Sequence, residues 1–582
     1  MVEQGRGRPL AVVATVALAG ALAGCGTVPS TGAVRYGRSV NQGAGGLDDS
    51  DIHVLPPAPG PGQSPEGVVE GFLRASANFD DDHAIARRYL TAAAARDWDP
   101  DAGITVYTAD PARRTVSAVA GTGSERTVVL HASRVATIAP DGAYTVSPGI
   151  IDQPLVLARS GADWRLARVP PGLLLTPTDV QRDLRSVFTY FLDAGQAVVV
   201  PDHVFLRTPA RGRPTALLRA LLDGPTRWLA PAVTTAFPPG TKLIGNAPLD
   251  GTVVVVNLSP EAGRAGPAAR AAMSAQLVWT LRQLPDITGV RIQVEGSAFG
   301  VPGAGDVQRI SDWASFDPDP ARPPPAYYFM ANGSLRTDSG APAPGPLGRG
   351  ALPLTSPAVG GEVVAGLRTT ATSTSLYAGP RAGLPTPRLA AARGGLTPPS
   401  VDGSGAVWTV RAGSPVAVLR IAPGGARAAG VPADALLRFG PVLELQISRD
   451  GTRAAAIVRT GTASRLLVGR VVPDRLGSPA LEGFRAVTVG LQGPSSVSWA
   501  DSHRVAVLAR TAPAGASSPW LVEADGSLAT SVATTGLPAG GPDRLAAGPD
   551  DVLIVAAAGG IYRSTGGSWT SIAAGTDPTW AR

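Results

Sequence analysis

The residue with the most distinctive chemistry is Cys25, the single cysteine among 582 residues. An apolar run over residues 10–21 precedes it, and Leu22, Ala23 and Gly24 lead directly to its thiol. This order is typical of a lipoprotein signal peptide, in which small residues fit the signal peptidase and the thiol accepts a diacylglyceryl group. The run is shorter than the roughly 20 residues that span a bilayer. We therefore expect cleavage before Cys25 and a lipid anchor on the extracytoplasmic face of the cell membrane; the alternatives are a plain signal peptide and an uncleaved anchor helix.

Other reactive residue types do not form a recognisable catalytic motif. The five histidines stand at positions 53, 83, 131, 203 and 503, so an HExxH zinc motif is absent from the sequence. The single lysine, Lys242, follows Thr241 instead of the glycine of a P-loop, and we expect it to be a solvated charge on an exposed turn. There is no Gly-x-Ser-x-Gly motif. We expect no catalytic residue, metal or cofactor, although a carboxylate pair of the kind glycosidases use stays open.

Composition fits an exported, multidomain protein. Hydrophobic residues make up 44% and charged residues 16%, which is a globular balance. No cysteine follows Cys25, so disulfides within the mature chain are excluded. The net charge of +6 is spread along the chain without a basic run, and we expect no nucleic-acid partner.

The first elements that could position a site lie beyond a Pro/Gly-rich linker, which we assign to residues 25–63 after a signal peptide over 1–24. Helical spacing followed by strand-like runs predicts an α+β domain over 64–175, with a helix that begins at Ser64-Pro65. Its order of elements looks like the cone-shaped NTF2-like fold. Trp98, Tyr107 and His131 are candidates to line a pocket there, the alternative being core or rim positions.

A second α+β domain is predicted over 176–300. We expect a helix over 180–192, a strand over 197–206, a helix that stops at Gly224-Pro225, a strand over 252–259, a helix to Pro285 and a strand over 290–294. The sequence carries Leu-Leu-Asp-Gly-Pro, Pro-Pro-Gly-Thr-Lys-Leu, Asp-Gly-Thr-Val-Val-Val-Val-Asn-Leu-Ser and Gln-Leu-Val-Trp-Thr-Leu in that order. This series resembles the GerMN domain of spore-germination and spore-formation proteins, a family that implies no chemistry.

An internal repeat predicts an all-β propeller over 320–582. Asp402, Asp450, Asp501 and Asp550 recur about every 50 residues, each between two strand-like runs, and such a period is typical of propeller blades. The length allows five or six blades, and residues 327–330 are expected to supply a strand that closes the ring. We interpret the aspartates as turn residues rather than metal ligands, because Asp bonds its own backbone in tight turns.

The complete order of lipobox, linker, α+β domain, GerMN domain and propeller resembles the actinobacterial LpqB lipoprotein family. That resemblance implies a lipoprotein carrying diacylglycerol and palmitate, associated with the extracellular domain of an MtrB-like sensor histidine kinase. It also implies a role in the MtrAB two-component system of cell-wall homeostasis and division. We therefore expect a non-enzymatic, membrane-anchored modulator of that kinase. An envelope glycan-binding protein or hydrolase is the alternative, and a purely structural lipoprotein is a third possibility.

Overall fold

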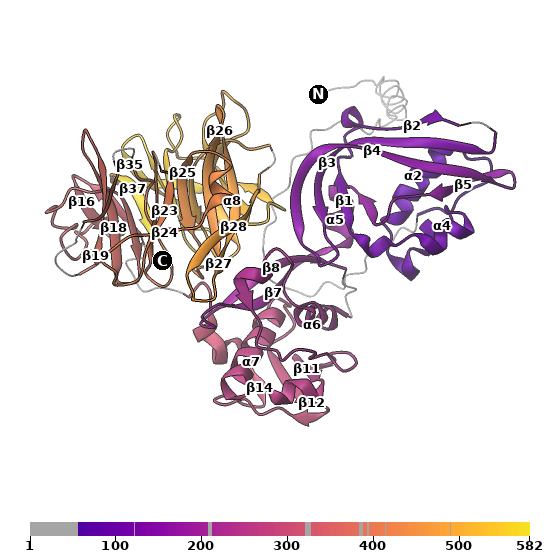
Figure 1. Ribbon diagram of the computed structural model, residues 1–582, viewed down its shortest axis with the longest axis horizontal. Coiled ribbons are helices and arrows are strands. Elements are labelled where there is room, and N and C mark those ends of the chain that lie inside the picture. The colour runs from indigo at the N-terminus through magenta and orange to yellow at the C-terminus, as the bar shows by residue number, and fades with distance from the viewer. Residues whose placement is uncertain are drawn as a thin grey trace, which may run out of the picture. The chain divides into compact units, whose positions relative to one another are not determined.

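The computed structural model describes residues 56–581, except 122, 208–211, 321–326, 383–387, 393–394, 414 and 489. The predicted lipobox, Leu22, Ala23, Gly24 and Cys25, and most of the predicted linker lie outside the described residues. The described elements follow one another as an α+β domain, a second α+β domain and a ring of sheets (Figure 1). Among them, no helix combines the length and apolar character that crossing a membrane requires.

The first domain packs short helices against one sheet. Helix α2 (Pro65–Ser76) begins where predicted, since the Ser64 hydroxyl accepts a hydrogen bond of 3.1 Å from the backbone N–H of Gly67. Its apolar face contributes Val68 and Phe72 to the domain core. Two short helices follow it, α3 (Ala84–Arg87) and α4 (Ala92–Asp97).

The sheet of this domain is built around the strand Glu125–Ile138, which pairs with three other strands. Its order is β5-β4-β3-β1-β6, with β2 also paired to β3. The strands are β1 (Ile104–Tyr107), β2 (Arg114–Ala120), β3 (Glu125–Ile138), β4 (Tyr144–Ser160), β5 (Asp163–Arg168) and β6 (Leu173–Leu175). Trp98 and Tyr107 are core residues, whereas the exposed His131 pairs with Asp152. The α+β class is confirmed, and the NTF2-like assignment stays a prediction.

The second domain holds two sheets and two longer helices. The first sheet has the order β8-β7-β9, and in the second, β11 pairs in parallel with β12. The elements are α5 (Pro177–Asp183), β7 (Arg185–Asp193), β8 (Val199–Leu206), α6 (Arg213–Asp223), β9 (Val233–Thr234), β10 (Leu249–Asp250), β11 (Val253–Leu258), α7 (Pro267–Leu281), β12 (Gly289–Val294), β13 (Ser297–Ala298) and β14 (Val307–Gln308).

The helix predicted over 180–192 is wrong beyond residue 183. Residues 185–193 form β7, a run rich in Val, Thr, Phe and Tyr, which favour strands because they pack well on a pleated surface. The other predicted elements of this domain are present as α6, α7, β8, β11 and β12.

Polar side chains of α7 complete the open edge of β7. The Gln276 side chain donates to the Tyr190 carbonyl (2.9 Å), and the Tyr190 N–H donates to the Thr280 hydroxyl (3.1 Å). One turn further, Gln283 accepts from the Phe188 N–H (3.0 Å) and donates to the Phe188 carbonyl. Residues at this spacing share one helix face. The helix and the turn after it therefore take the place of a neighbouring strand at Phe188 and Tyr190, and β9 pairs with β7 at Leu192 and Asp193.

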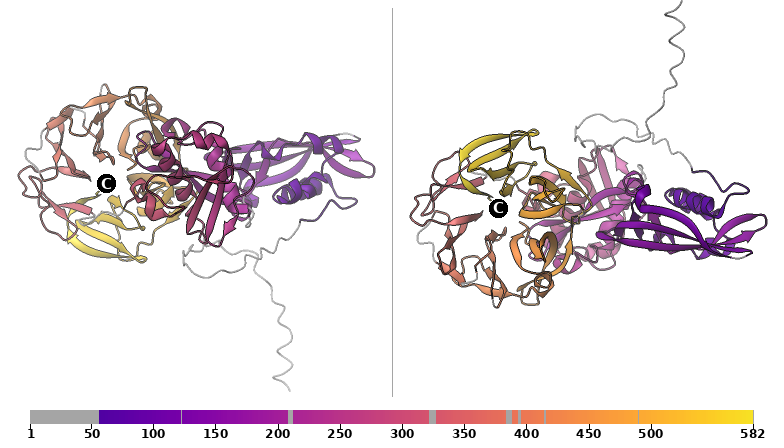
Figure 2. Two further views of the ribbon diagram at one scale, coloured as in Figure 1. Left: turned by 90° about the horizontal axis from the view of Figure 1, so that it is seen from below. Right: turned by 90° about the horizontal axis from the view of Figure 1, so that it is seen from above.

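The third domain is a six-bladed propeller in the described residues (Figure 2). Five sheets have four strands in sequence order, and the sixth has the order β16-β15-β37. It therefore joins β15 (Tyr327–Ala331) to the C-terminal strand β37 (Thr576–Trp580), which confirms the predicted closing strand. Such closure leaves only short, protected sheet edges.

The strands of the blades run as follows. They are β16 (Ser334–Thr337), β17 (Thr355–Gly360), β18 (Val363–Thr369), β19 (Thr374–Pro380), β20 (Arg388–Ala392), β21 (Ser400–Val401), β22 (Val407–Arg411), β23 (Ala417–Ile421), β24 (Ala429–Val431), β25 (Val442–Ile447), β26 (Arg453–Thr460), β27 (Ala463–Pro473), β28 (Pro479–Ala486), β29 (Gln492–Trp499), β30 (Arg504–Arg510), β31 (Ser518–Glu523), β32 (Ala529–Ser531), β33 (Arg544–Ala547), β34 (Leu553–Ala557), β35 (Gly560–Thr565) and β36 (Ser568–Ala574).

The repeated aspartates have the predicted turn role. The carboxylates of Asp402, Asp450 and Asp501 each accept a hydrogen bond of 2.8–3.0 Å from a backbone N–H two residues later. Asp550 has a φ of +57°, the left-handed conformation that Asp tolerates. No group of His, Cys, Asp and Glu suited to a metal ion occurs in the part of the chain that the structure describes.

Candidate functional site

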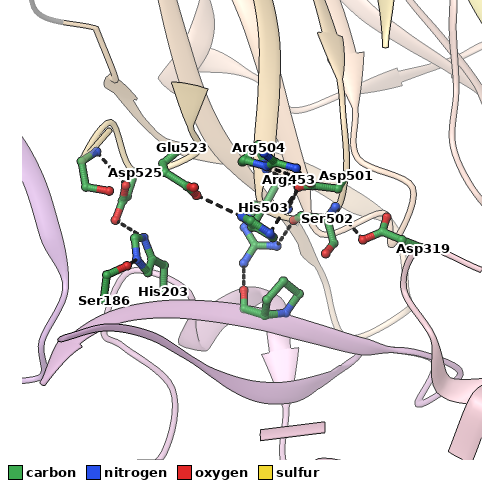
Figure 3. Close-up of polar contacts among 12 residues, drawn as sticks. Ser186, His203, Asp319, Arg453, Asp501, Ser502, His503, Arg504, Glu523 and Asp525 are labelled. Carbon is green, nitrogen blue, oxygen red and sulfur yellow. Dashed lines mark hydrogen bonds and ion pairs between the residues drawn. The ribbon is translucent and has the colours of Figure 1, made fainter. Parts of the chain in front are cut away.

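A buried histidine of the second domain contacts the propeller. Strand pairing places Phe188 opposite His203 and Ser186 opposite Phe205, so these four side chains share one face of β7 and β8. The Nδ1 atom of His203 lies 2.8 Å from a carboxylate oxygen of Asp525, in the turn after β31 (Figure 3). Its Nε2 atom lies 2.5 Å from the Ser186 hydroxyl. The His203 and Asp525 side chains are only 10% and 7% exposed.

A second histidine approaches the same face from the propeller. His503 lies in the turn before β30, and its ring centre is 4.5 Å from that of Phe188. The Phe188 ring also stacks on the ring of His203, with 4.7 Å between the two ring centres. The His503 Nδ1 atom is 3.0 Å from a carboxylate oxygen of Glu523. Phe188 therefore contacts two imidazoles, each held by an acidic residue of the propeller.

Next to these histidines, Arg453 connects the propeller to the backbone of the second domain, and Asp202 bonds a loop within its own domain. The Asp202 carboxylate accepts hydrogen bonds from the backbone N–H (2.6 Å) and hydroxyl (3.0 Å) of Thr226. Arg453, on β26, donates to the Pro201 carbonyl and, at 3.3 Å, to the Ser502 carbonyl. Burial raises the pKa of Asp202 to about 6, although the Thr226 bonds and the charge of Arg453 act in the other direction.

The first domain reaches the junction through the turn between β3 and β4. The Asp141 carboxylate accepts a hydrogen bond of 2.9 Å from the Arg227 N–H, and the Gly142 carbonyl accepts one of the same length from the Phe205 N–H. Both bonds link this turn to the second domain.

The same segment also contacts the propeller. Arg485 of β28 donates to the Tyr144 carbonyl (3.1 Å) and the Thr145 hydroxyl (3.0 Å), and its guanidinium stacks on the Trp228 ring at 4.3 Å. The indole N–H of Trp228 donates to the Gly483 carbonyl at 2.9 Å. Elements of all three domains thus meet at one place.

At that meeting point lies a recess of about 410 Å³. Its polar lining includes Tyr144, Asp202, His203, Arg453, Arg485 and Asp525. Burial, together with the charge of Asp525, raises the pKa of Tyr144 to about 12. Because carboxylates, guanidiniums and imidazoles line it, the recess suits water or a small polar ligand.

Buried charge shifts the proton affinity of the histidines. Burial opposes a charged imidazole, but the carboxylates around His203, chiefly Asp525, outweigh burial and raise its pKa. At His503, burial is outweighed in the same way by Glu523 and Asp501, and the pKa is raised. The pKa of Asp525 is lowered: burial would raise it, but the charge of His203 prevails.

A second candidate site lies among the inner strands of the propeller. A recess of about 580 Å³ is lined by residues that include Glu444, Gln446, Arg544, Asp577 and Trp580. The Gln446 amide donates to the Glu444 carboxylate at 3.3 Å. This lining offers both signs of charge and an indole, which is suited to a polar ligand.

Sequence reasoning treated the histidines as isolated, because nothing local to His203 or His503 indicates the other. The structure brings them together around Phe188, which the sequence placed in a helix. Asp525 precedes Gly526, a turn signal like the repeated aspartates, and that pattern could have drawn attention to it. Lys242 is exposed, as expected, and the Cys25 prediction falls outside the described residues.

Comparison with family models covers each domain. Residues 58–181 match the model described as Lipoprotein LpqB, N-terminal domain, and residues 333–581 match the Lipoprotein LpqB beta-propeller domain. Residues 189–299 match the model described as Sporulation and spore germination, which confirms the GerMN resemblance.

Solved structures show distant likenesses to single parts of the chain. TolB from Acinetobacter baumannii covers 44% of this chain and 66% of its own, with 11% identity and a TM-score of 0.34. The first GerMN domain of GerM from Bacillus subtilis covers 22% of this chain and 98% of its own, with 20% identity and a TM-score of 0.19.

Whole-length relatives agree with the family models. A protein named Lipoprotein LpqB from Thermobifida fusca is 33% identical, over 89% of this chain and 90% of its own. Its namesake from Streptomyces coelicolor is 31% identical, over 99% and 98%, and that from Mycobacterium tuberculosis is 28% identical, over 84% and 85%. The chain therefore belongs to the LpqB lipoprotein family.

Proposed function

We propose that this protein is anchored by acylated Cys25 to the outer face of the cell membrane, binds the extracellular domain of an MtrB-like sensor histidine kinase, and modulates its signalling. In this proposal residues 1–24 are a cleaved signal peptide, Leu22, Ala23 and Gly24 form the recognition sequence, and the first domain is NTF2-like. The observation that supports it most is the meeting of three domains at one hydrogen-bonded junction. Such a junction lets surfaces of different domains act together on one partner.

The anchor supplies much of the effective affinity. A single acyl chain holds a protein only marginally at a membrane, whereas the two chains of a diacylglyceryl group hold it stably. Anchored lipoprotein and kinase would share one membrane surface, where the effective concentration of each for the other is high. A weak protein interface is then sufficient for a useful occupancy.

The test is site-specific photo-crosslinking of the acylated, full-length protein in membranes that contain the kinase. One photoreactive residue is placed on each domain, at the exposed positions Val119 (61% exposed), Leu249 (51%) and Leu476 (91%). Crosslinks from one or two of these positions to the kinase extracellular domain are expected, and they identify the binding face. Crosslinks to other proteins only, from all three positions, would contradict the proposal.

A second candidate function, acyl-ester hydrolysis, rests on a single observation. Ser186, His203 and Asp525 have the order of hydroxyl, imidazole and carboxylate found in serine hydrolases, with separations of 2.5 and 2.8 Å. The hydroxyl oxygen would attack the ester carbonyl and pass its proton to Nε2 of His203, which must be neutral for this step. The imidazole would return that proton to the leaving alcohol, and water would then release the acyl group from Ser186.

A fluorophosphonate probe separates the two functions, because it reacts with activated serines. Labelling of the full-length protein that disappears in Ser186→Ala would establish the hydrolase. The modulator function predicts no labelling of Ser186, at a probe concentration that fully labels a known serine hydrolase.

A further inference from the structure

At the junction between the second domain and the propeller, two histidines each lie against a carboxylate of the propeller. We propose that this junction is a proton-controlled latch, in which protonated His203 and His503 hold β7 and β8 against the propeller and neutral histidines release them. The inference rests on the geometry of the junction and is independent of which partner the protein binds.

The first part of the latch is the pair between His203 and Asp525. In the docked arrangement a protonated imidazole faces the carboxylate at 2.8 Å, and both side chains are at least nine-tenths buried. The other charged or titratable groups around His203 are Glu523 and Asp202, which favour its charged form, and the lining residues Arg453, Arg485, Tyr144 and His503. When His203 loses its proton, Asp525 becomes a buried carboxylate without an opposite charge at contact distance, and such a charge is costly to keep from water.

The second part is His503 with its own acidic neighbours. Its Nδ1 atom faces Glu523 at 3.0 Å and its Nε2 atom faces Asp501 at 3.6 Å, while Arg504 is the neighbouring positive charge. Across the junction its ring contacts Phe188 of β7. A protonated imidazole against an aromatic ring gains further attraction. Deprotonation thus weakens both contacts of this ring.

Two buried carboxyl groups at the same junction also bind protons more tightly in the docked state, so their protonation favours docking as well. Burial raises the pKa of Asp202 to about 6, with Asp141 adding and Thr226 and Arg453 opposing. Burial also raises the pKa of Asp319 to about 6. Asp319 accepts a hydrogen bond of 2.9 Å from the Ser502 N–H, and its other charged neighbours are Asp501, Asp450 and Arg449.

The sign of the pH dependence follows from these shifts. A group whose pKa is higher in the docked state binds more protons there, so docking is strongest below its ordinary pKa and weakens as pH rises through the raised value. The ordinary values are 3.8 for Asp and 6.5 for His. Asp202 and Asp319 therefore weaken docking as pH rises towards 6, and the histidines weaken it above 6.5. Asp525 acts in the opposite direction, but only in more acidic solution, because its pKa is lowered below 3.8.

The experiment is hydrogen–deuterium exchange on the full-length protein in detergent micelles, from pH 5.5 to 8.5. The reporters are peptides covering β7, β8 and residues 500–505, with rates corrected for the intrinsic pH dependence of exchange. Deprotonation of each histidine is expected to raise the equilibrium constant for opening of the junction by up to about tenfold per pH unit, once the pH exceeds 6.5. Peptides of β3 and β4 away from the junction serve as an internal reference.

Variants test whether the two histidines cause the increase in junction opening with pH, which is called the slope below. His203→Gln with His503→Gln is expected to flatten it, whereas His131→Gln, an exposed histidine of the first domain, is expected to leave it unchanged. Since His203→Gln leaves Asp525 without its partner, the neutral pair His203→Gln with Asp525→Asn is also measured, and it is expected to remain docked with a reduced slope. The latch is contradicted by a junction whose protection does not change between pH 6.5 and 8.5, or by slopes that are equal in the wild type and the double-histidine variant.

Discussion

The contact between the first domain and the propeller at Gly526 gives a sharp test of the junction. A Cβ atom added there would lie 2.5 Å from a methyl carbon of Val146 and would also collide with the Val487 carbonyl. Val487 belongs to the propeller, as Gly526 does, whereas Val146 belongs to β4 of the first domain. Gly526→Ala therefore strains its own turn and also presses on the contact between the two domains. With a φ of +82°, the new alanine also adopts a strained backbone conformation.

Two effects contribute to the free-energy cost of Gly526→Ala. A non-glycine residue in the left-handed region costs about 1–2 kcal/mol. Overpacking adds about 1–3 kcal/mol, which corresponds to an increase of about 5- to 150-fold in opening of the contact. Gly559→Ala is the matched control, because Gly559 has a φ of +76° and no atom within 4 Å of the added Cβ. Gly559→Ala therefore has the backbone strain of Gly526→Ala but not its steric clash.

The assay is hydrogen–deuterium exchange in peptides that cover residues 141–146 and Phe205. Gly526→Ala is expected to accelerate exchange there, and Gly559→Ala is expected to leave these peptides unchanged. Equal exchange in the two variants would refute the conclusion that the first domain and the propeller are held together at this contact.

Two further predictions concern the anchor and the second domain. Cys25→Ser is expected to release the protein from membranes while its circular dichroism spectrum stays that of the folded domains; retention in the membrane fraction would show that the anchor lies elsewhere. Gln276→Leu leaves the Tyr190 carbonyl and the Ala236 N–H without their buried partners, at about 1–3 kcal/mol each. Thermal unfolding of the second domain is expected at a lower temperature than for the exposed control Gln181→Leu, and identical melting would show that α7 does not complete the β7 edge.

Local patterns predicted the elements whose boundaries depend on a few neighbouring residues. The start of α2 follows from Ser64-Pro65, and the end of α6 follows from Gly224-Pro225, because capping and chain reversal are set within one turn. The closing strand at Tyr327 and the turn role of the repeated aspartates were also readable, since a repeated unit shows its own period.

The error at β7 has a physical cause. Val180, Leu184, Phe188 and Phe191 have helical spacing, but the same segment is also rich in the aromatic and β-branched residues that favour strands, so periodicity alone does not decide. The decision comes from tertiary partners, since β8 pairs with β7, and polar side chains of α7 and strand β9 satisfy further backbone groups of β7.

The junction could not be predicted from a single sequence for a related reason. The hydrogen bond from Trp228 to Gly483 joins residues 255 positions apart, and His203 and Asp525 are similarly distant. No local motif encodes such pairs. They become visible only when the fold places the turn after β31 against the face of β7 and β8.

The most direct test of the proposed function is kinase autophosphorylation in vesicles. The kinase is reconstituted with its extracellular domain facing outward, with either the acylated protein or an equal bulk amount of Cys25→Ser. We predict that the acylated protein changes the autophosphorylation rate and that the unanchored variant has little effect at the same concentration. An autophosphorylation rate that is the same with the acylated protein as with empty lipid would contradict the account.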